Sequence, residues 1–143
     1  MHFFESEEKK RARLEREAAE QEAKRIAAEE QNRKLEAIDR IVISTGPINN
    51  NYNILQAICS VSTKEITPGL FSGRTTVDQD DIERLYSMTV KKLKENAYRV
   101  GADAVIHCKF DLDQVASVSG NERDTKTTFY ATIFCTGTAV QFI

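Results

Sequence analysis

The sequence predicts an α+β fold in two layers, with one helix on a small, mostly antiparallel sheet, preceded by a long charged N-terminal helix. Half of the charged residues lie between positions 5 and 40, in a stretch without Gly or Pro. Residues 78–100 repeat apolar side chains at helical spacing, and three alternating or uncharged runs are typical of strands: 54–63, 103–113 and 127–142. Because the composition changes at Ile41, we expect a charged helix over residues 1–40 and an α+β domain over residues 41–143.

The charged segment is predicted to form one helix. Eleven acidic and ten basic residues lie between Glu5 and Arg40, and most of the others are good helix formers. An acidic residue four positions before a basic one stabilises a helix by roughly 0.2–0.5 kcal/mol. Six such pairs occur: Glu5–Lys9, Glu7–Arg11, Glu20–Lys24, Glu29–Arg33, Glu30–Lys34 and Glu36–Arg40. We expect a helix of about 34 residues, which is about 50 Å long.

The sequence is compatible with three roles for this helix. Seven-residue frames through residues 5–40 place polar side chains such as Gln21 and Arg25 in positions that a strong coiled coil keeps apolar. The favoured interpretation is a solvated spacer. The alternatives are a weak coiled coil tethered to an oligomer, and an arm that docks on a partner helix.

Two short strands are predicted to open the domain. Ile41-Val42-Ile43 is a β-branched run that ends before Gly46-Pro47. In the strand 54–63, apolar residues occupy alternate positions and are expected to face the core: Leu55, Ala57, Cys59 and Val61. Residues 64–76, with one proline and two glycines, are predicted to be a loop.

The helix predicted over residues 78–100 has a narrow apolar stripe. Its members are Ile82, Leu85, Met88 or Thr89, Leu93, Ala97 and Val100. Gly101 suits the position just after a helix end. This helix is expected to pack on one surface and to expose its other side to water.

The last two strands are predicted to form a hairpin. In the strand 103–113, one face is expected to hold Ala104, Ile106, Cys108, Phe110 and Leu112. Residues 114–126 are predicted to be a polar connection. Residues 127–142 carry no charge and no proline, which is typical of a central strand. The strand 54–63 can then pair with the free edge of the last strand, and the helix crosses over the sheet.

One helix covers only one face of such a sheet. The other face is semi-polar, and we expect it to form a subunit contact through His107, Tyr130, Thr132, Phe134 and Thr136. Small sheets also leave edges that must be covered or paired. The sequence therefore predicts a homo-oligomer.

Several motifs of the domain resemble the YbjQ-like family. Residues 97–106 (AYRVGADAVI), followed by Lys109-Phe110-Asp111, are similar to the helix-to-strand signature of that family. Residues 41–45 (IVIST) and 52–54 (YNI) are similar to its opening, and Gly137-Thr138-Ala139-Val140 to its closing strand. The resemblance covers about 100 residues from Ile41 onward in the family's order. It implies a dodecin-subunit-like fold, a pentameric ring and the label "putative heavy-metal-binding".

Three cysteines are the candidates for a metal site. Cys59, Cys108 and Cys135 fall on three predicted strands, each on the face expected to be apolar, so their sulfurs could converge. Thiolates bind soft metals such as zinc and copper(I), although zinc usually takes four ligands. No two cysteines have the close spacing of a metal motif, so buried core cysteines are the favoured interpretation and no cofactor is expected.

The composition argues against several other function classes. The net charge of −2 gives no attraction to nucleic acid, and no apolar run approaches the ~20 residues of a membrane span. The chain has two histidines and none of the common phosphate-binding, zinc-protease or serine-hydrolase motifs, so we expect no enzyme. The odd number of cysteines and the acidic start, which lacks an apolar signal core, favour the cytoplasm.

We therefore expect an oligomeric binding or scaffold protein without catalytic activity. The alternatives are a soft-metal binding protein and a protein that holds a small ligand between its subunits, where pockets often form.

Overall fold

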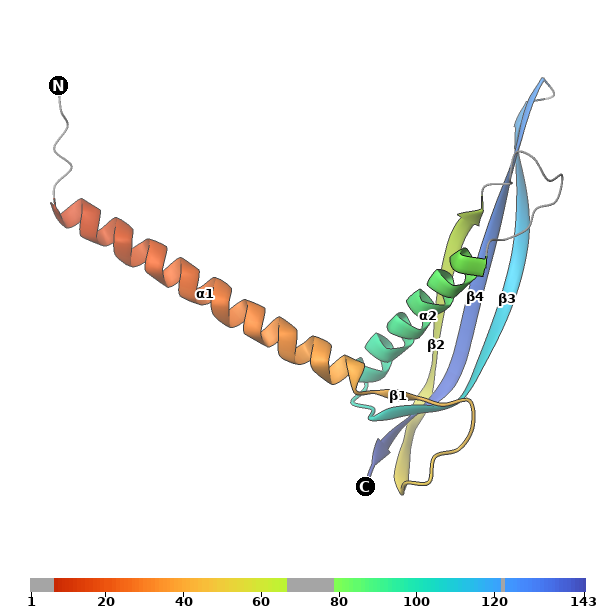
Figure 1. The fold of residues 1–143 in the computed structure, drawn as a ribbon, viewed down its shortest axis with the longest axis horizontal. Coiled ribbons are helices and arrows are strands. Elements are labelled where there is room, and N and C mark those ends of the chain that lie inside the picture. Colours follow the sequence, from red (N-terminus) through yellow and green to blue (C-terminus); the bar gives the residue numbers. More distant parts are fainter. Residues whose placement is uncertain (1–6, 67–78, 122) are drawn as a thin grey trace. The chain divides into compact units, whose positions relative to one another are not determined.

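The computed structural model describes residues 7–66, 79–121 and 123–143. The chain divides into two units, residues 1–37 and 38–143. Six elements follow one another along the chain (Figure 1): α1 (Glu7–Asp39), β1 (Val42–Ile43), β2 (Tyr52–Ile66), α2 (Gln79–Arg99), β3 (Ala104–Asn121) and β4 (Asp124–Phe142). The predicted α+β fold class, with its long charged leading helix, is confirmed.

The described part of the first unit is helical and belongs to α1, which is 33 residues long and ends just after the unit boundary. Ion pairs at helical spacing lie along it: Arg13–Glu17 at 3.1 Å, Glu20–Lys24 at 2.6 Å and Glu22–Arg25 at 2.6 Å. The second of these is one of the six predicted pairs. All three pairs are largely exposed, so each adds only a few tenths of a kcal/mol, by the order of magnitude typical of helix surfaces.

The second unit is built on a four-stranded sheet with the order β1-β3-β4-β2. β4 pairs antiparallel with both β2 and β3, and β1 adds to β3 in parallel through two residues. The prediction that the uncharged last strand is central is confirmed, as is its pairing with the strand that begins near Ile54. A central strand is flanked by neighbours on both sides, which is why it avoids charged side chains.

The connection predicted over residues 114–126 is wrong. β3 continues to Asn121 and β4 starts at Asp124, and the two strands stay in register from Lys109 to Asn121. The segment is polar, but Val115 and Val118 are good strand formers, and backbone pairing needs no buried side chains. Part of the predicted loop 64–76 is also strand, because β2 extends to Ile66. The rest of that loop lies outside the described residues.

α2 packs on one face of the sheet through a stripe of buried residues. Leu85, Thr89, Leu93 and Ala97 recur every four positions and are buried, as the helical spacing predicts. Figure 1 shows α2 alongside β2 and β4, which are the strands that it contacts most. The core under α2 includes Leu93, Val105, Cys135 and Ala139. The backbone N–H of Gly101, at φ 76°, donates to the carbonyl of Tyr98 and helps to end the helix.

Two bulges change which side chains face α2. The register shifts between Ile54 and Gln56 in β2, and between Ile106 and Lys109 in β3. His107 has φ 53° at the second bulge, and its N–H donates to the carbonyl of Gly46 at 3.3 Å. One extra residue in a strand moves all later side chains to the opposite face.

Both predicted strand faces therefore need correction. In β2, Ala57, Cys59 and Val61 face away from α2 and are exposed, while Ile58, Ser60 and Ser62 lie under the helix. In β3, Ala104 and Ile106 pack on the side opposite the helix, whereas Cys108 and Phe110 pack on the helix side. Side chains alternate within each strand as predicted, but each bulge exchanges the two faces, so one predicted face does not hold along the whole strand.

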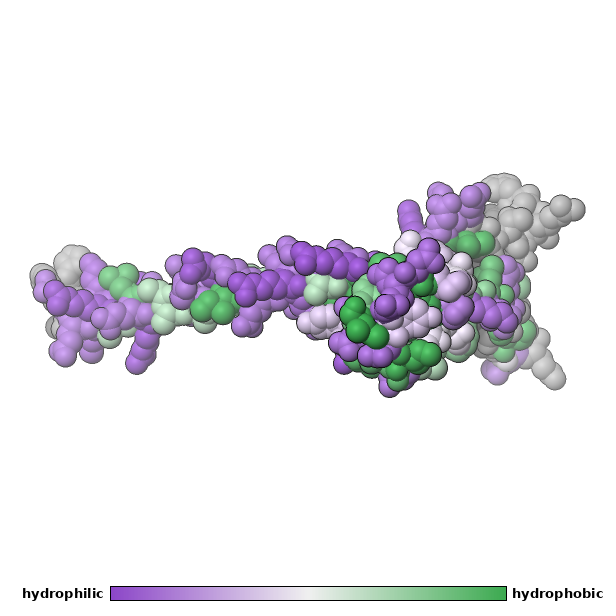
Figure 2. Space-filling model, turned by 90° about the horizontal axis from the view of Figure 1, so that it is seen from below, coloured by the Kyte–Doolittle hydropathy of each residue, from purple (hydrophilic) through white to green (hydrophobic). Residues whose placement is uncertain are grey.

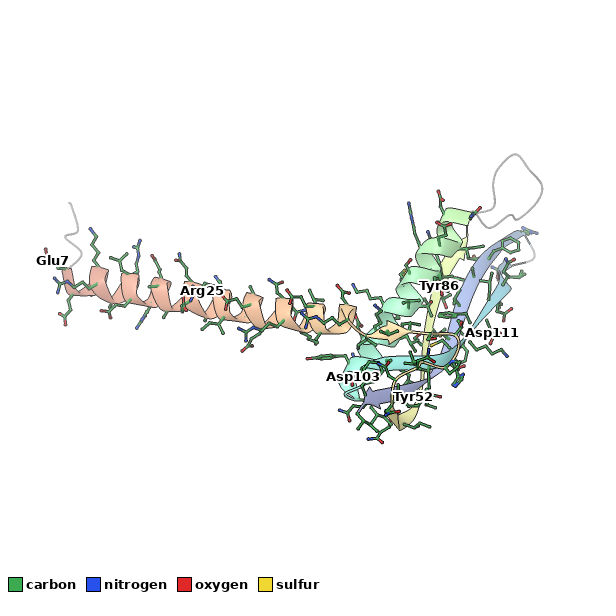
Figure 3. All side chains as sticks on the ribbon, turned by 60° about the horizontal axis from the view of Figure 1, so that its bottom comes forward. Glu7, Arg25, Tyr52, Tyr86, Asp103 and Asp111 are labelled. Carbon is green, nitrogen blue, oxygen red and sulfur yellow. The ribbon has the colours of Figure 1, made fainter. Side chains whose placement is uncertain are left out.

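A second small core lies at one end of the sheet, on the face opposite α2. Ala104, Ile106 and Val140 are buried there beneath Ile48 and Tyr52. The Asp103 carboxylate accepts a hydrogen bond from the N–H of Phe142 at 2.8 Å, which holds the end of β4 in place. Figure 3 shows Tyr52 and Asp103 at this end of the domain. The segment before β2 thus covers the end of this face and leaves its middle uncovered.

Candidate functional site

The middle of the sheet presents its uncovered side chains opposite α2, and this surface is called the open face below. Its members come from three strands: Ala57, Cys59, Val61 and Thr63 of β2, Lys109, Asp111 and Asp113 of β3, and Tyr130, Thr132, Phe134 and Thr136 of β4. All of them are exposed or half-buried. The open face is thus a surface to which three strands contribute.

The register arranges these residues in rungs across the strands. Cys59, Thr136 and Lys109 form one rung. Val61, Phe134 and Asp111 form the next, followed by Thr63, Thr132 and Asp113. Each rung thus runs from an apolar or small polar residue on β2 to a charged residue on β3. Over these three rungs the open face therefore has an apolar side on β2 and β4 and a charged side on β3, formed by Lys109, Asp111 and Asp113. The Tyr130 rung reverses the order, with Glu65 on β2 and Val115 on β3.

The apolar side carries large exposed side chains next to each other. Val61 is 48% exposed and Phe134 is 42% exposed, and the register places them directly opposite one another. On the following rung, the hydroxyls of Thr63 and Thr132 are 3.0 Å apart and hydrogen-bond. Figure 2, which looks at the domain from one end, shows apolar surface gathered on the second unit, whereas the surface of α1 is mostly hydrophilic.

The structure brings together four of the five predicted interface residues. Tyr130, Thr132, Phe134 and Thr136 alternate along β4 on the open face. His107 does not belong to this group, because it sits within the bulge and no regular strand pairing defines its face. Whether the four form a subunit contact stays a prediction.

The outer edge of β2 is covered by side chains of α2. Lys92 Nζ donates to the carbonyl of Val61 at 3.0 Å, and Asn96 Nδ2 donates to the carbonyl of Cys59 at 2.8 Å. These carbonyls would otherwise be free to pair with another strand. A shallow groove of about 340 Å³ lies here, and its lining includes Phe134, Lys92, Glu95, Asn96 and Arg99.

This groove was not predicted from the sequence. Lys92, Asn96 and Arg99 recur at helical spacing beside the apolar stripe of α2, which was the available signal. Because charged residues on the side of a helix are usually solvated, that spacing alone did not mark a site.

The opposite edge of the sheet is covered only in part. β1 pairs with Ala104 and Val105, and the segment after β1 continues along β3 until Ser44 accepts a hydrogen bond from the N–H of Cys108. From Lys109 onward, no other strand within residues 7–66, 79–121 and 123–143 pairs with the outer edge of β3. Lys109, Asp111 and Asp113 lie beside this open edge. Figure 3 shows Asp111 on β3 and Tyr86 on α2, whose ring contacts Phe110.

The favoured interpretation of buried core cysteines is confirmed for Cys108 and Cys135 and is wrong for Cys59, so the three sulfurs do not share one face of the sheet. Cys108 and Cys135 lie in the core under α2, whereas Cys59 is exposed on the open face. The bulge in β2 and the pairing of Ser60 with Cys135 turn Cys59 to the other side of the sheet.

The two buried thiols contact one another and stay protonated. Burial, with a smaller contribution from the neighbouring Cys108, raises the pKa of Cys135 to about 12. Burial also raises the pKa of Cys108. Metal ions bind the thiolate, so the raised pKa values oppose metal binding.

The donor set does not fit a four-ligand zinc site. In the part of the chain that the structure describes, no three side chains of His, Cys, Asp or Glu come together as a metal would require. Nor is any helix in the described part of the chain long and apolar enough to cross a bilayer.

A family model covers the whole second unit of the chain. Residues 37–143 match the model of the YbjQ-like family, whose description is "putative heavy-metal-binding". The crystal structure of a protein of unknown function from Pediococcus pentosaceus ATCC 25745, assigned to the DUF74 family, is similar to the chain. It covers 72% of this chain and 98% of its own length, at 18% sequence identity and a TM-score of 0.48. No match was found among curated proteins.

Proposed function

This chain belongs to the YbjQ-like family, and from that premise we propose that it is a homo-oligomeric binding or scaffold protein without catalytic activity. The family resemblance implies a pentameric ring. The contribution of this chain to such an assembly is the open face, whose apolar side we assign to contact with a second copy.

The observation that carries the proposal is the pair Val61 and Phe134. Antiparallel sheets often leave one face to water, but that face is then polar at most positions. Here a valine and a phenylalanine share one rung, with close to half of each side chain exposed, among threonines that are compatible with either environment. Full burial of such a side chain is worth about 1.5–3 kcal/mol, so covering this rung in every copy of a ring favours assembly.

The proposal of a non-catalytic role rests on the chemistry of the same face. A hydroxyl or thiol nucleophile needs a base within hydrogen-bonding reach. The hydroxyls of Thr63 and Thr132 bond to each other, and Cys59 has Thr136 as its cross-strand neighbour. These residue types are suited to packing and to hydrogen bonding with a partner.

Substitution of Phe134 by glutamate tests the contact. The chain Phe134→Glu would place a charge in the covered rung, and we expect light scattering at micromolar concentration to show a lower mass than for the original chain. Met88→Glu is the matched control, because Met88 is equally exposed but lies on α2. A mass that Phe134→Glu leaves unchanged, or that Met88→Glu lowers equally, would contradict the assignment.

For α1 we propose a solvated spacer. The exposed ion pairs along it support a helix that is stable in water, and the polar residues in its core frames argue against a strong coiled coil. A docking arm for a partner helix is the alternative. In a ring, several such helices would extend the assembly without contributing to its contacts.

A soft-metal site is the second candidate, and it rests on the contact between the thiols of Cys108 and Cys135. Copper(I) would have to displace both protons from buried groups whose pKa values are raised. We therefore expect equal uptake of zinc and copper(I), in equilibrium dialysis, by the original chain and by a variant with all three cysteines changed to serine. One additional copper(I) in the original chain would instead establish the metal site.

A small ligand between subunits is the third candidate, with the groove beside β2 as its place. Native mass spectrometry of the purified full chain would detect a retained ligand as a fixed mass increment on the assembly.

A further inference from the structure

The groove beside β2 carries charges in a defined order along the strand. Lys92 bonds to the carbonyl of Val61 and thus lies at the rung that contains Phe134 and Asp111. Asn96 marks the neighbouring rung, because it bonds to the carbonyl of Cys59, and Glu95 lines the groove next to it. From the Val61 rung to the Cys59 rung, the groove therefore presents a positive side chain, Lys92, and then a negative one, Glu95. Arg99, which donates to Asn96 Oδ1 at 3.5 Å, adds a second positive charge after them.

The charged side of the open face carries the opposite order. Asp111 lies on the Val61 rung and Lys109 lies on the Cys59 rung. Both side chains are exposed, and neither they nor Glu95 form an ion pair within the described part of the chain. From the Val61 rung to the Cys59 rung, β3 therefore presents a negative side chain, Asp111, and then a positive one, Lys109.

These two charge patterns lie on opposite edges of the same sheet. In a ring whose axis runs along the strands, rotation from one copy to the next leaves the height along the axis unchanged. Each rung of one copy then meets the same rung of its neighbour. Two different surfaces that meet in this way form a head-to-tail contact, which closes into a ring when the rotation between neighbouring copies divides a full turn evenly.

We propose that the groove beside β2 of one copy receives the charged side of the open face of a second copy, with Lys92 facing Asp111 and Glu95 facing Lys109. This inference rests on the proposed homo-oligomer and names the two surfaces that meet in it. The groove is completed only when the second copy supplies these two charges. Charge complementarity of this kind selects the partner surface and its register.

A charge exchange tests the contact in the full chain. The variants Lys92→Glu and Asp111→Lys each place like charges opposite one another, and the double variant restores an opposite pair. We expect each single variant to raise, by about tenfold or more, the concentration at which half of the oligomer dissociates, and the double variant to return it to within about threefold of the original value. Light scattering over a dilution series measures this concentration.

Lys91→Glu is the matched control, since Lys91 is the exposed neighbour of Lys92 and does not line the groove. If circular dichroism shows that a charge reversal unfolds the chain, Lys92→Gln and Asp111→Asn test the same contact. Each of them removes a charge without reversing it, so the expected effect is smaller. This contact would be overturned if the single variants behaved like Lys91→Glu, or if the double variant dissociated as easily as the single ones. The proposed homo-oligomer would still stand as long as the original chain assembles. An original chain that is monomeric at every concentration would overturn both.

Discussion

The covered face and the open face of the sheet are formed by the same three strands, yet they are completed in different ways. Under α2, Leu93, Cys135 and Ala139 are fully buried, and the small side chains of β4 allow the helix to approach closely. On the open face, Val61 and Phe134 remain nearly half exposed on neighbouring strands. α2 buries one face within a single chain. The other face exposes apolar area at the middle of the sheet, and no element of the described residues covers it there.

The difference between the faces predicts where substitutions destabilise the chain itself. Leu93→Ala removes a fully buried side chain from the covered face, and we expect it to lower the free energy of unfolding by about 2–5 kcal/mol. Met88→Ala, on the exposed side of the same helix, should change it by less than about 0.5 kcal/mol. Urea unfolding at one protein concentration measures both. Equal effects would mean that α2 does not bury the stripe described above.

Alkaline pH should weaken the covered face specifically. A thiol in the unfolded chain has a pKa of about 8.5, whereas burial raises that of Cys135 to about 12. Folding therefore favours the protonated thiol, so its contribution to stability is complete below about pH 8.5 and is lost as the pH rises towards 12. At pH 10 the loss from Cys135 is about 2 kcal/mol.

Two alanine variants test this pH dependence. Between pH 7 and pH 10, Cys135→Ala should lose about 2 kcal/mol less stability than the original chain. Met88→Ala should follow the original chain, because Met88 is exposed on α2 and carries no thiol. Identical losses of stability in all three proteins would show that ionisation of the buried Cys135 thiol does not cause the loss at high pH.

β3 and β4 approach each other closely at Gly137, on the covered face. A Cβ at Gly137 would lie 2.5 Å from Val105 Cγ1 and 3.0 Å from Cys108 Sγ, so Gly137→Ala forces a stiff buried valine to move. We expect a loss of about 1–3 kcal/mol. Gly46→Ala is the control, because nothing lies within 4 Å of its Cβ position. Thermal unfolding that leaves both variants at the original midpoint would contradict this packing.

The smallest effects are expected in the polar seam between α2 and β2. Ser60 Oγ donates to the carbonyl of Thr89 at 2.9 Å, and Ser60→Ala should cost about 1 kcal/mol. Ser62 Oγ is buried and has no hydrogen-bond partner in the described structure, so Ser62→Ala should be neutral or stabilising by about 1 kcal/mol. Chemical denaturation of the two variants compares them directly, and a larger loss for Ser62→Ala would reverse this reasoning.

The difference between the two faces could be predicted only in part from the sequence. The stripe of α2 and the uncharged last strand were sufficient to predict the helix, the central strand and the pairing of β2 with β4, because burial on one side or on both constrains composition directly. The bulges near Leu55 and at His107 carry no glycine or other signal, and each one reverses the faces beyond it. For this reason Cys59 is exposed, although the sequence predicted that it faces the core like Cys108 and Cys135.

The candidate site was predicted best where no bulge intervenes. Tyr130, Thr132, Phe134 and Thr136 were placed on one face by simple alternation, and β4 is regular throughout that stretch. The groove beside β2 depends instead on how α2 reaches around an edge strand. That geometry follows from tertiary packing, and neither Lys92 nor Asn96 is distinguished from other exposed polar residues by its place in the sequence.

The mass of the full chain in solution tests most directly whether the open face is covered by another copy. Native mass spectrometry across a concentration series should give one assembly whose mass is a whole multiple of 16.2 kDa, with five copies expected from the family resemblance. A single species of 16.2 kDa at micromolar concentration and above would contradict the account.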